Sequence, residues 1–273
     1  MRSQSFPFAY LLVTHGSRDP RPHWATAQLA QRVVQRLHSR LPQVLPLALA
    51  STATRVATYG GQRNQQLASK PALVGTAVLE LGSSPLPEQI QQFTETVRTA
   101  GYRRIRIVPL FLLPGVHVME DIPEAVAEAQ SCLGTAISLE LQPYLGSHSQ
   151  LAQLVADSVK ANRDRTWMLL AHGSRRPGGN RPIEQLAQQL GMHPAYWAVE
   201  PSARSQLERL VAQGQQRISL LPYFLFEGSL TDAIAQMVKQ FVADYPQVTV
   251  NLAQPLSHSL QLADLITDLA LHN

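Results

Sequence analysis

The sequence predicts an α/β fold of two similar lobes, each with a four-stranded parallel sheet flanked by helices. Short apolar runs alternate with amphipathic segments along most of the chain. The apolar runs are continuous rather than interrupted by polar residues, which is typical of strands that are buried on both faces. The same order of motifs also occurs twice, which indicates an internal duplication.

Each half is predicted to contain four strands and four helices. Alternating strands and helices of this kind form a parallel sheet that is covered by helices. In the first half, strands are predicted at 8–14, 73–81, 103–113 and 136–142, with helices at about 22–39, 86–99, 118–131 and 148–162. In the second half, strands are predicted at 166–171, 195–199, 216–226 and 247–253, with helices near 181–190, 202–213, 229–243 and 257–271.

Two pairs of motifs define the duplication. "LLVTHGSRDPRP" (11–22) resembles "MLLAHGSRRPGG" (168–179), and the two histidines are 157 residues apart. "IRIVPLFLLPGVHVMEDI" (105–122) resembles "ISLLPYFLFEGSLTDAI" (218–234) at an offset of 113, so the first half carries about 44 extra residues. Part of this excess is the segment 43–72, which is predicted to be a longer helix and a flexible excursion. We expect one lobe over 1–147 and the other over 148–273.

Composition indicates a globular protein. Of the 273 residues, 45% are hydrophobic and 15% are charged, and no apolar run reaches the roughly 18 residues of a membrane span. The N-terminal apolar stretch lacks a small-residue cleavage site, so it is interpreted as the first buried strand rather than a signal peptide. The single cysteine, Cys132, excludes an internal disulfide and fits a reducing cytoplasm.

The basic charge balance favours an anionic ligand. The formal net charge is +4, but the basic residues are dispersed, and the densest cluster is Arg103, Arg104 and Arg106. Aromatic residues make up only 6% and do not interleave with the basic ones, so nucleic acid is not expected as a partner. A polyanionic small molecule fits better, because guanidinium groups bind carboxylates and phosphates in bidentate fashion. The arginines beside the two HGS motifs are Arg18, Arg21, Arg175 and Arg176.

Three side chains of the first half are candidates for chemistry: His15, Glu80 and His117. Each alone has an ordinary structural explanation. A histidine often makes structural hydrogen bonds, and Glu80 can be a solvated residue just after the end of its strand. Together they lie at the carboxyl ends of strands in one sheet, where this kind of fold binds ligands. Two imidazoles and a carboxylate suit a divalent cation such as Fe²⁺, Co²⁺, Ni²⁺ or Zn²⁺, and they can also accept protons near neutral pH.

The neighbours of these residues have structural explanations. Ser17 can cap the helix that follows it, and Asp121 and Glu124 suit a helix N-terminus. The second half keeps His172, but Leu230 stands at the place of His117. Counting back from the next proline puts Tyr196 at the place of Glu80. We therefore expect one active site, in the first half. His148 and His258 stand at matched places in the two halves and are interpreted as caps or packing residues. Four other histidines have no supporting context: His23, His38, His193 and His272.

The motifs resemble those of the sirohydrochlorin chelatases, the class II cobalt and iron chelatases of siroheme and cobalamin biosynthesis. The resemblance rests on "LLVTHGSRDP", "LELGSSP" and "VPLFLLPGVHVMEDIP", together with the second "LLAHGSRRP" and "LPYFLFEGSLTDAI". It is clearest over 8–35, 75–157 and 166–268, and it indicates a long form that carries both repeats in one chain. The stretch between His15 and Glu80 is longer than is usual in the family.

The resemblance implies a chelatase-like fold and a cytoplasmic enzyme that inserts Co²⁺ or Fe²⁺ into sirohydrochlorin. His15 and His117 would be the active-site histidines and metal ligands, with Glu80 as the accompanying acid. Ser17, Arg18 and Arg175 are expected to contact the carboxylates of the tetrapyrrole. The metal would be a substrate, with no tightly bound cofactor and no membrane partner. A monomer is expected, because one chain supplies both lobes.

Two alternatives differ in class from a chelatase. A non-catalytic two-lobed protein that binds metal or tetrapyrrole would need no proton acceptors, and the residues leave it open. A histidine phosphohydrolase would place an arginine directly before its histidine. Thr14 and Ala171 stand at these positions, which argues against it.

Overall fold

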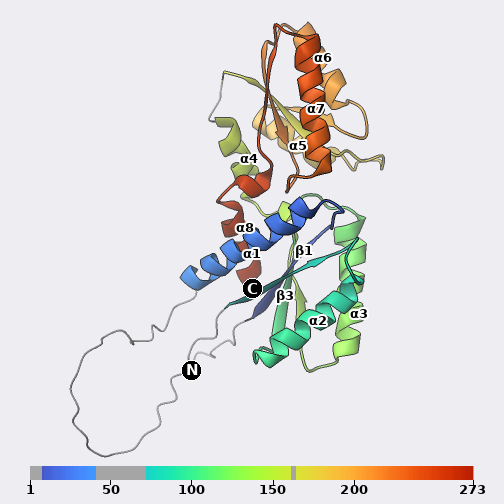
Figure 1. Cartoon of the computed structure of the whole chain (residues 1–273), viewed down its shortest axis with the longest axis vertical. Helices are drawn as coiled ribbons and strands as arrows, with labels where there is room; N and C mark the ends of the chain where they lie inside the picture. The colour runs from blue at the N-terminus through green and yellow to red at the C-terminus, as the bar shows by residue number, and fades with distance from the viewer. Residues whose placement is uncertain (1–7, 41–71, 161–163, 273) are drawn as a thin grey trace, which may run out of the picture.

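The protein, described here from a computed structural model, has two α/β lobes of the same plan (Figure 1). The structure describes residues 8–40, 72–160 and 164–272. Each lobe contains one parallel sheet of four strands, which confirms the predicted fold class. Apart from Ala72, the predicted excursion over 43–72 lies outside the described residues.

The first lobe has the strand order β2-β1-β3-β4. Its strands are β1 (Ala9–Thr14), β2 (Leu73–Val78), β3 (Arg104–Pro109) and β4 (Ser138–Leu141). Its part of the chain forms the helices α1 (Pro20–Arg40), α2 (Leu86–Thr99), α3 (Ile122–Leu133) and α4 (Leu151–Lys160). Two short turns complete it, the π-helical η1 (His117–Asp121) and the 3₁₀ turn η2 (Leu145–Ser147).

The second lobe repeats this arrangement with the strand order β6-β5-β7-β8. Its strands are β5 (Thr166–Ala171), β6 (His193–Tyr196), β7 (Arg217–Pro222) and β8 (Thr249–Leu252). The remaining elements are α5 (Arg181–Leu190), α6 (Ala203–Ala212), α7 (Ser229–Asp244), the 3₁₀ turn η3 (Leu256–His258) and α8 (Leu262–Leu271).

The strands are buried on both faces, as their apolar runs predict. In β1, Leu11 and Val13 pack with α2 and α3 in one apolar cluster, while Tyr10 and Leu12 belong to another cluster on the opposite face. That second cluster contains residues of both lobes, including Leu29 of α1 and Leu169 of β5. The two lobes therefore share a continuous apolar core.

Strands β3 and β7 are shorter than predicted. The apolar runs extend to residues 113 and 226, but the strands end at Pro109 and Pro222. Beyond the proline of β3, the amide of Leu110 still donates to the carbonyl of Val13, and then the chain turns away. The later residues are apolar for another reason, because Phe111 and Leu112 pack against two different clusters at the end of the sheet.

The strand order places a topological switch point between β1 and β3. The helix after β1 joins the shared core, whereas α2 and α3 cover the other face. The loops after β1 and β3 therefore diverge to opposite faces and leave a crevice at the carboxyl ends of these strands. His15 directly follows β1, and His117 begins the turn that follows β3.

The last helix of the chain packs on the first lobe. Figure 1 shows α8 beside α1, and α8 also contacts β3. An ion pair between Arg36 and Asp264 joins α1 to α8 at 2.8 Å. The division at 147/148 stays a prediction, and α8 links the two sides of it. Within the described parts of the chain, no helix combines the length and apolarity that crossing a membrane requires.

Two arginines of the densest basic cluster make structural contacts. Arg106 is almost fully buried, pairs with Glu140 at 3.2 Å and donates to the carbonyl of Ala270 in α8 at 2.8 Å. Arg104 pairs with the same carboxylate from a half-exposed position. Both guanidinium groups lie over the ring of Phe8. These contacts give Arg104 and Arg106 structural roles.

We expect Arg106→Met to lower the free energy of unfolding by about 2–3 kcal/mol, because it removes a buried charged donor from Glu140 and from α8. The matched control is Arg104→Met, which breaks an exposed pair and should cost less than about 1 kcal/mol. Urea denaturation measures both losses. Equal losses would show that the bond from Arg106 to α8 contributes nothing.

Candidate metal and substrate site

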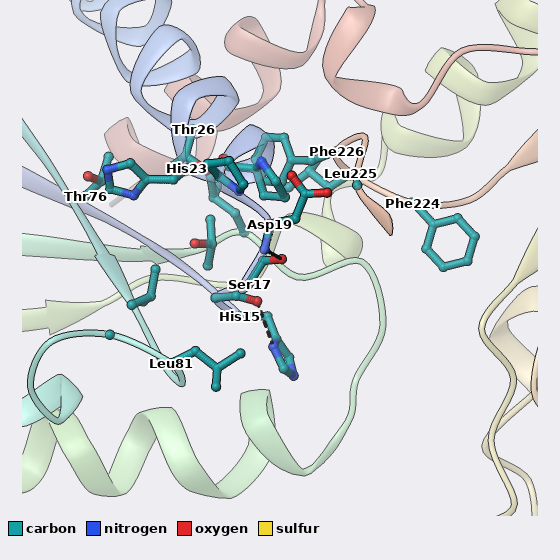
Figure 2. Close-up of a pocket in the computed structure, with 18 of the residues that line it drawn as sticks. His15, Ser17, Asp19, His23, Thr26, Thr76, Leu81, Phe224, Leu225 and Phe226 are labelled. Atoms are coloured by element: carbon teal, nitrogen blue, oxygen red, sulfur yellow. Dashed lines mark hydrogen bonds between the residues drawn. The ribbon is translucent and has the colours of Figure 1, made fainter. Parts of the chain in front are cut away.

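A cavity of about 990 Å³ opens between the lobes at the carboxyl ends of the strands. Figure 2 shows His15, Ser17, His23 and Leu81 of the first lobe at this cavity, with Phe224 of the second lobe across from them. His117 and His172 also line it. Both HGS motifs thus face one shared space.

His15, Glu80 and His117 converge as predicted. One potential ligand atom from each side chain lies within 4.8 Å of the others. His15 Nε2 is 3.9 Å from Glu80 Oε2, and the two imidazole rings meet edge to face with centroids 4.9 Å apart. The His15 and Glu80 side chains are each about half exposed, at 52% and 51%. This arrangement can hold a metal ion and remain open to a second ligand.

Backbone hydrogen bonds fix His15 beside Glu80. The amides of Leu79 and Glu80 donate to the carbonyls of Thr14 and His15, each at 2.8 Å, and continue the β1–β2 pairing beyond the strands. Gly16 permits this approach: its φ is +102°, and a Cβ added there would lie 1.9 Å from the carbonyl oxygen of Glu80. The glycine of the first HGS motif is therefore required by the position of Glu80.

Gln89 of α2 holds the loop that carries Glu80. Its side chain accepts a hydrogen bond from the amide of Val78 at 3.0 Å and donates to the carbonyl of Val78 at 2.8 Å. It also donates to the carbonyl of Ser84 at 2.8 Å. Because β2 is an edge strand, this amide group satisfies backbone groups that have no neighbouring strand. Both ends of the loop are thereby tied to α2.

The π-helical turn η1 presents His117 to the cavity. The amide of Ile122 donates to the carbonyl of His117, five residues back, and Pro123 follows without an amide hydrogen to continue the pattern. Such turns are rare and are often found at functional sites. The ring of Phe111 lies 6.2 Å from that of His117 and 6.3 Å from that of His15, so an aromatic side chain supports both histidines.

Asp121 orients the imidazole of His117. Its Oδ2 lies 2.6 Å from Nδ1 of His117. When this carboxylate accepts a hydrogen bond from Nδ1, the Nε2 atom of a neutral imidazole keeps its lone pair for a metal ion. The expectation that Asp121 only suits a helix N-terminus was therefore incomplete. Its spacing of four residues from His117 could have indicated the contact.

The second lobe lacks two of the three donors. The amide of Tyr223 donates to the carbonyl of Leu170, just as the amide of Leu110 donates to the carbonyl of Val13. Tyr223 is therefore the counterpart of Leu110, and counting seven residues on from each puts Leu230 at the place of His117. The prediction that Tyr196 takes the place of Glu80 was wrong. The amide that donates to the carbonyl of His172 belongs to Ala198, so Ala198 is the counterpart of Glu80. Counting from the proline failed because the two loops differ in length.

Of the three residues predicted to bind substrate carboxylates, one lines the cavity and two do not. Ser17 lines the cavity, and its hydroxyl accepts a hydrogen bond from the amide of Asp19 at 3.0 Å. Arg18 and Arg175 are exposed and are not among the described residues that line the cavity. Their contact with a substrate stays a prediction.

Arg21 bridges the two lobes rather than facing the cavity. It binds Asp19 in its own lobe and makes two hydrogen bonds to Asp232 of α7, at 2.9 and 2.5 Å. These bonds lower the pKa of both carboxyl groups. Ser229 of α7 also donates to Asp19, at 3.3 Å. Four side chains thus join the starts of α1 and α7 beside the cavity.

Sequence reasoning missed His23 and the wall from Phe224 to Glu227. His23 lies in the first turn of α1, and its side chain lines the cavity. Its position just after the HGS motif, at the ligand-binding edge of the sheet, could have indicated this. Glu227 lines the cavity from the second lobe and pairs with His258 at 3.2 Å. This contact joins two loops that are distant in sequence.

We expect Gly16→Ala to destabilise the protein by about 3 kcal/mol or more, because a methyl group collides with the Glu80 carbonyl and the positive φ is unfavourable for alanine. Gly115→Ala is the matched control near His117. An added Cβ there meets nothing within 4 Å, so it should change stability by less than about 0.5 kcal/mol. Thermal unfolding of both variants checks this, and a Gly16→Ala variant as stable as the control would contradict it.

Comparison with known proteins gives curated relatives of one kind. The chain is 24% identical over 180 residues to the sirohydrochlorin cobaltochelatase of Priestia megaterium, in a match covering 60% of this chain and 58% of that protein. It is 26% identical over 193 residues to the sirohydrochlorin ferrochelatase of the same organism, covering 63% and 72%. The match therefore spans little more than half the length of the cobaltochelatase.

Solved structures with the same fold include SirB from Bacillus subtilis with Fe³⁺, at a TM-score of 0.69 and 20% identity, covering 96% of this chain and 94% of that one. The sirohydrochlorin chelatase SirB from Bacillus subtilis subspecies spizizenii in complex with cobalt has a TM-score of 0.63 at 20% identity, covering 97% and 94%. The CbiX family model matches residues 53–162 and again 166–272, once in each half of the chain. The chain belongs to the CbiX family.

Proposed function

We propose that this protein inserts a divalent metal ion, Co²⁺ or Fe²⁺, into sirohydrochlorin. The observation that carries the proposal is the convergence of His15, Glu80 and His117 within 4.8 Å at a cavity large enough for a macrocycle. The two relatives from Priestia megaterium are named for this reaction with cobalt and with iron. The donor set suits both metals, so it does not choose between them.

The chemistry of insertion fits these side chains. Two pyrrole N–H protons leave the free-base ring as its nitrogens bind the metal, so the site needs proton acceptors as well as metal ligands. A neutral imidazole can act in either role. Three donors at an exposed site leave coordination positions open, which lets the ion pass to the ring rather than remain bound. His15 and His117 take these roles in our proposal, and Glu80 assists.

The substrate proposal extends to the cavity walls. Sirohydrochlorin carries eight carboxylates, which suits the basic balance of the chain. We propose that Ser17 binds one of them at the cavity, and that Arg18 and Arg175 reach others from outside it. The single exposed cysteine supports a cytoplasmic location. The presence of both lobes in one chain supports a monomer as the working form.

The direct test is anaerobic mixing of the protein with sirohydrochlorin and excess Co²⁺ or Fe²⁺, followed by absorption spectroscopy. A chelatase converts many equivalents of tetrapyrrole per protein. A spectral change that stops at one equivalent would instead identify a non-catalytic binder. If neither metal produces a change above the protein-free rate, the proposal is rejected. A histidine phosphohydrolase would need an arginine at the positions where Thr14 and Ala171 stand.

We expect His15→Ala and His117→Ala each to reduce metal insertion by at least about 100-fold, because each removes a ligand and a proton acceptor. Circular dichroism and thermal unfolding should show an intact fold, since both side chains are partly exposed. The matched control is His172→Ala, which removes the counterpart histidine from the same cavity. It should bind Co²⁺ as the unaltered protein does. Full insertion activity in either first-lobe variant would refute these roles.

We expect Asp121→Asn to weaken Co²⁺ binding by about 10- to 100-fold, because the amide no longer fixes the proton on Nδ1 of His117. Titration followed through the Co²⁺ d–d absorption bands measures the affinity directly, without turnover. The control is Glu120→Gln, which removes a neighbouring exposed carboxylate. If both variants weaken binding equally, general charge rather than orientation of the imidazole explains the effect.

A further inference from the structure

Leu81 has a strained backbone at the edge of the candidate site. Its φ is +59°, and among the described residues it is the only one other than glycine with a positive φ. Leucine is disfavoured in this left-handed region because its Cβ crowds the following carbonyl group. Strain of this kind persists where the surrounding structure holds it, and it is concentrated at functional sites.

The neighbouring glycine does not relieve this strain. Gly82 has no positive φ, and it is glycine because of crowding. A Cβ there would lie 2.7 Å from Cγ2 of Val78 and 2.9 Å from Nε2 of Gln89. The same Gln89 side chain that holds the loop thus requires glycine at position 82. The left-handed turn falls one residue earlier, on Leu81.

The second lobe provides an internal comparison. Because Ala198 is the counterpart of Glu80, Val199 is the counterpart of Leu81. Val199 has a negative φ, lies against Gly173 and packs on the apolar core shared by the lobes. The lobe without the donor set therefore turns this side chain inward. The lobe with the donor set turns it outward, at the cost of backbone strain.

The side chain of Leu81 is largely outside the apolar core. It is 58% exposed, follows Glu80 directly, and lines the same cavity as His15 and His117 (Figure 2). An exposed leucine beside a polar donor set gains little from water, but it would gain from an apolar surface laid over it. A metal-insertion site brings such a surface to its donors, since the substrate is a flat conjugated ring.

We infer that Leu81 contacts the face of the tetrapyrrole ring and positions it over the donor set of His15, Glu80 and His117. This inference rests on the proposed function. Leu81 is a substrate-binding residue and not a metal ligand, so it acts on affinity for the macrocycle. The left-handed turn directs the side chain into the cavity while Glu80 keeps its backbone bond to His15.

The test replaces Leu81 by asparagine, which tolerates the left-handed backbone and is similar in size but polar. We expect Leu81→Asn to raise the dissociation constant for metal-free sirohydrochlorin about tenfold or more, the loss that follows when one leucine contact is removed. The KM for the tetrapyrrole should rise with it. The midpoint of thermal unfolding should stay equal or increase, because asparagine relieves the strain. Binding of Co²⁺ alone should not change.

Two further variants complete the experiment. Leu81→Met keeps an apolar side chain at the same backbone, so it should lose much less affinity than Leu81→Asn. Leu260→Asn alters a leucine that is 71% exposed and is not among the residues lining the cavity, so it should bind sirohydrochlorin normally.

The inference would be overturned if Leu81→Asn bound sirohydrochlorin as tightly as the unaltered protein, or if it lost as much affinity for Co²⁺ as for sirohydrochlorin. A lowered unfolding midpoint would also overturn it, because Leu81 would then be a packing residue. If the unaltered protein fails to bind or metallate sirohydrochlorin, the proposed function itself fails. That result is separate, because it is seen before any variant is compared.

Discussion

The candidate site depends on one backbone hydrogen bond, from the amide of Glu80 to the carbonyl of His15. This bond extends the parallel pairing of β1 and β2 past the end of the sheet, so two side chains 65 residues apart emerge side by side. Gly16 makes the approach possible, and Gln89 holds the opposite side of the same loop. A parallel sheet can thus present a carboxylate beside an imidazole while both side chains lie outside the apolar core.

The separation of the two lobes is held by two different kinds of contact. The apolar core shared by β1, β5 and their helices is non-directional and fixes the lobes broadly. Arg21, Asp19 and Asp232 add directional bonds at the edge of the cavity. Asp232 is exposed and Arg21 is partly exposed, so salt screens the bond between the lobes, which contributes mainly to geometry rather than to stability. The shared apolar core and the bonds of Arg21 together therefore determine the width of the cavity.

Much of the fold and part of the site could be predicted from sequence. Continuous apolar runs and the repeated HGS motif indicate two parallel sheets, and the carboxyl ends of β1, β2 and β3 bring His15, Glu80 and His117 together. The counterpart of Glu80 could not be counted correctly, because the loop lengths differ and only the backbone bond from Ala198 settles it. The contact between Asp121 and His117 could have been inferred from their spacing of four residues, but the π-helical turn that presents His117 has no clear sequence signature. The strain at Leu81 is likewise a property of backbone angles alone.

The position of α8 has a consequence for biosynthesis of the protein. On one face of the first sheet, α1 is joined by α8, the last helix of the described chain, and Ala270 accepts the bond from buried Arg106. During translation, β1 and β3 leave the ribosome long before α8 does. Until then the face of the first sheet that carries Tyr10 and Leu12 is only partly covered, and Arg106 lacks its acceptor in α8. The first lobe therefore completes this core only after α8 has been synthesised.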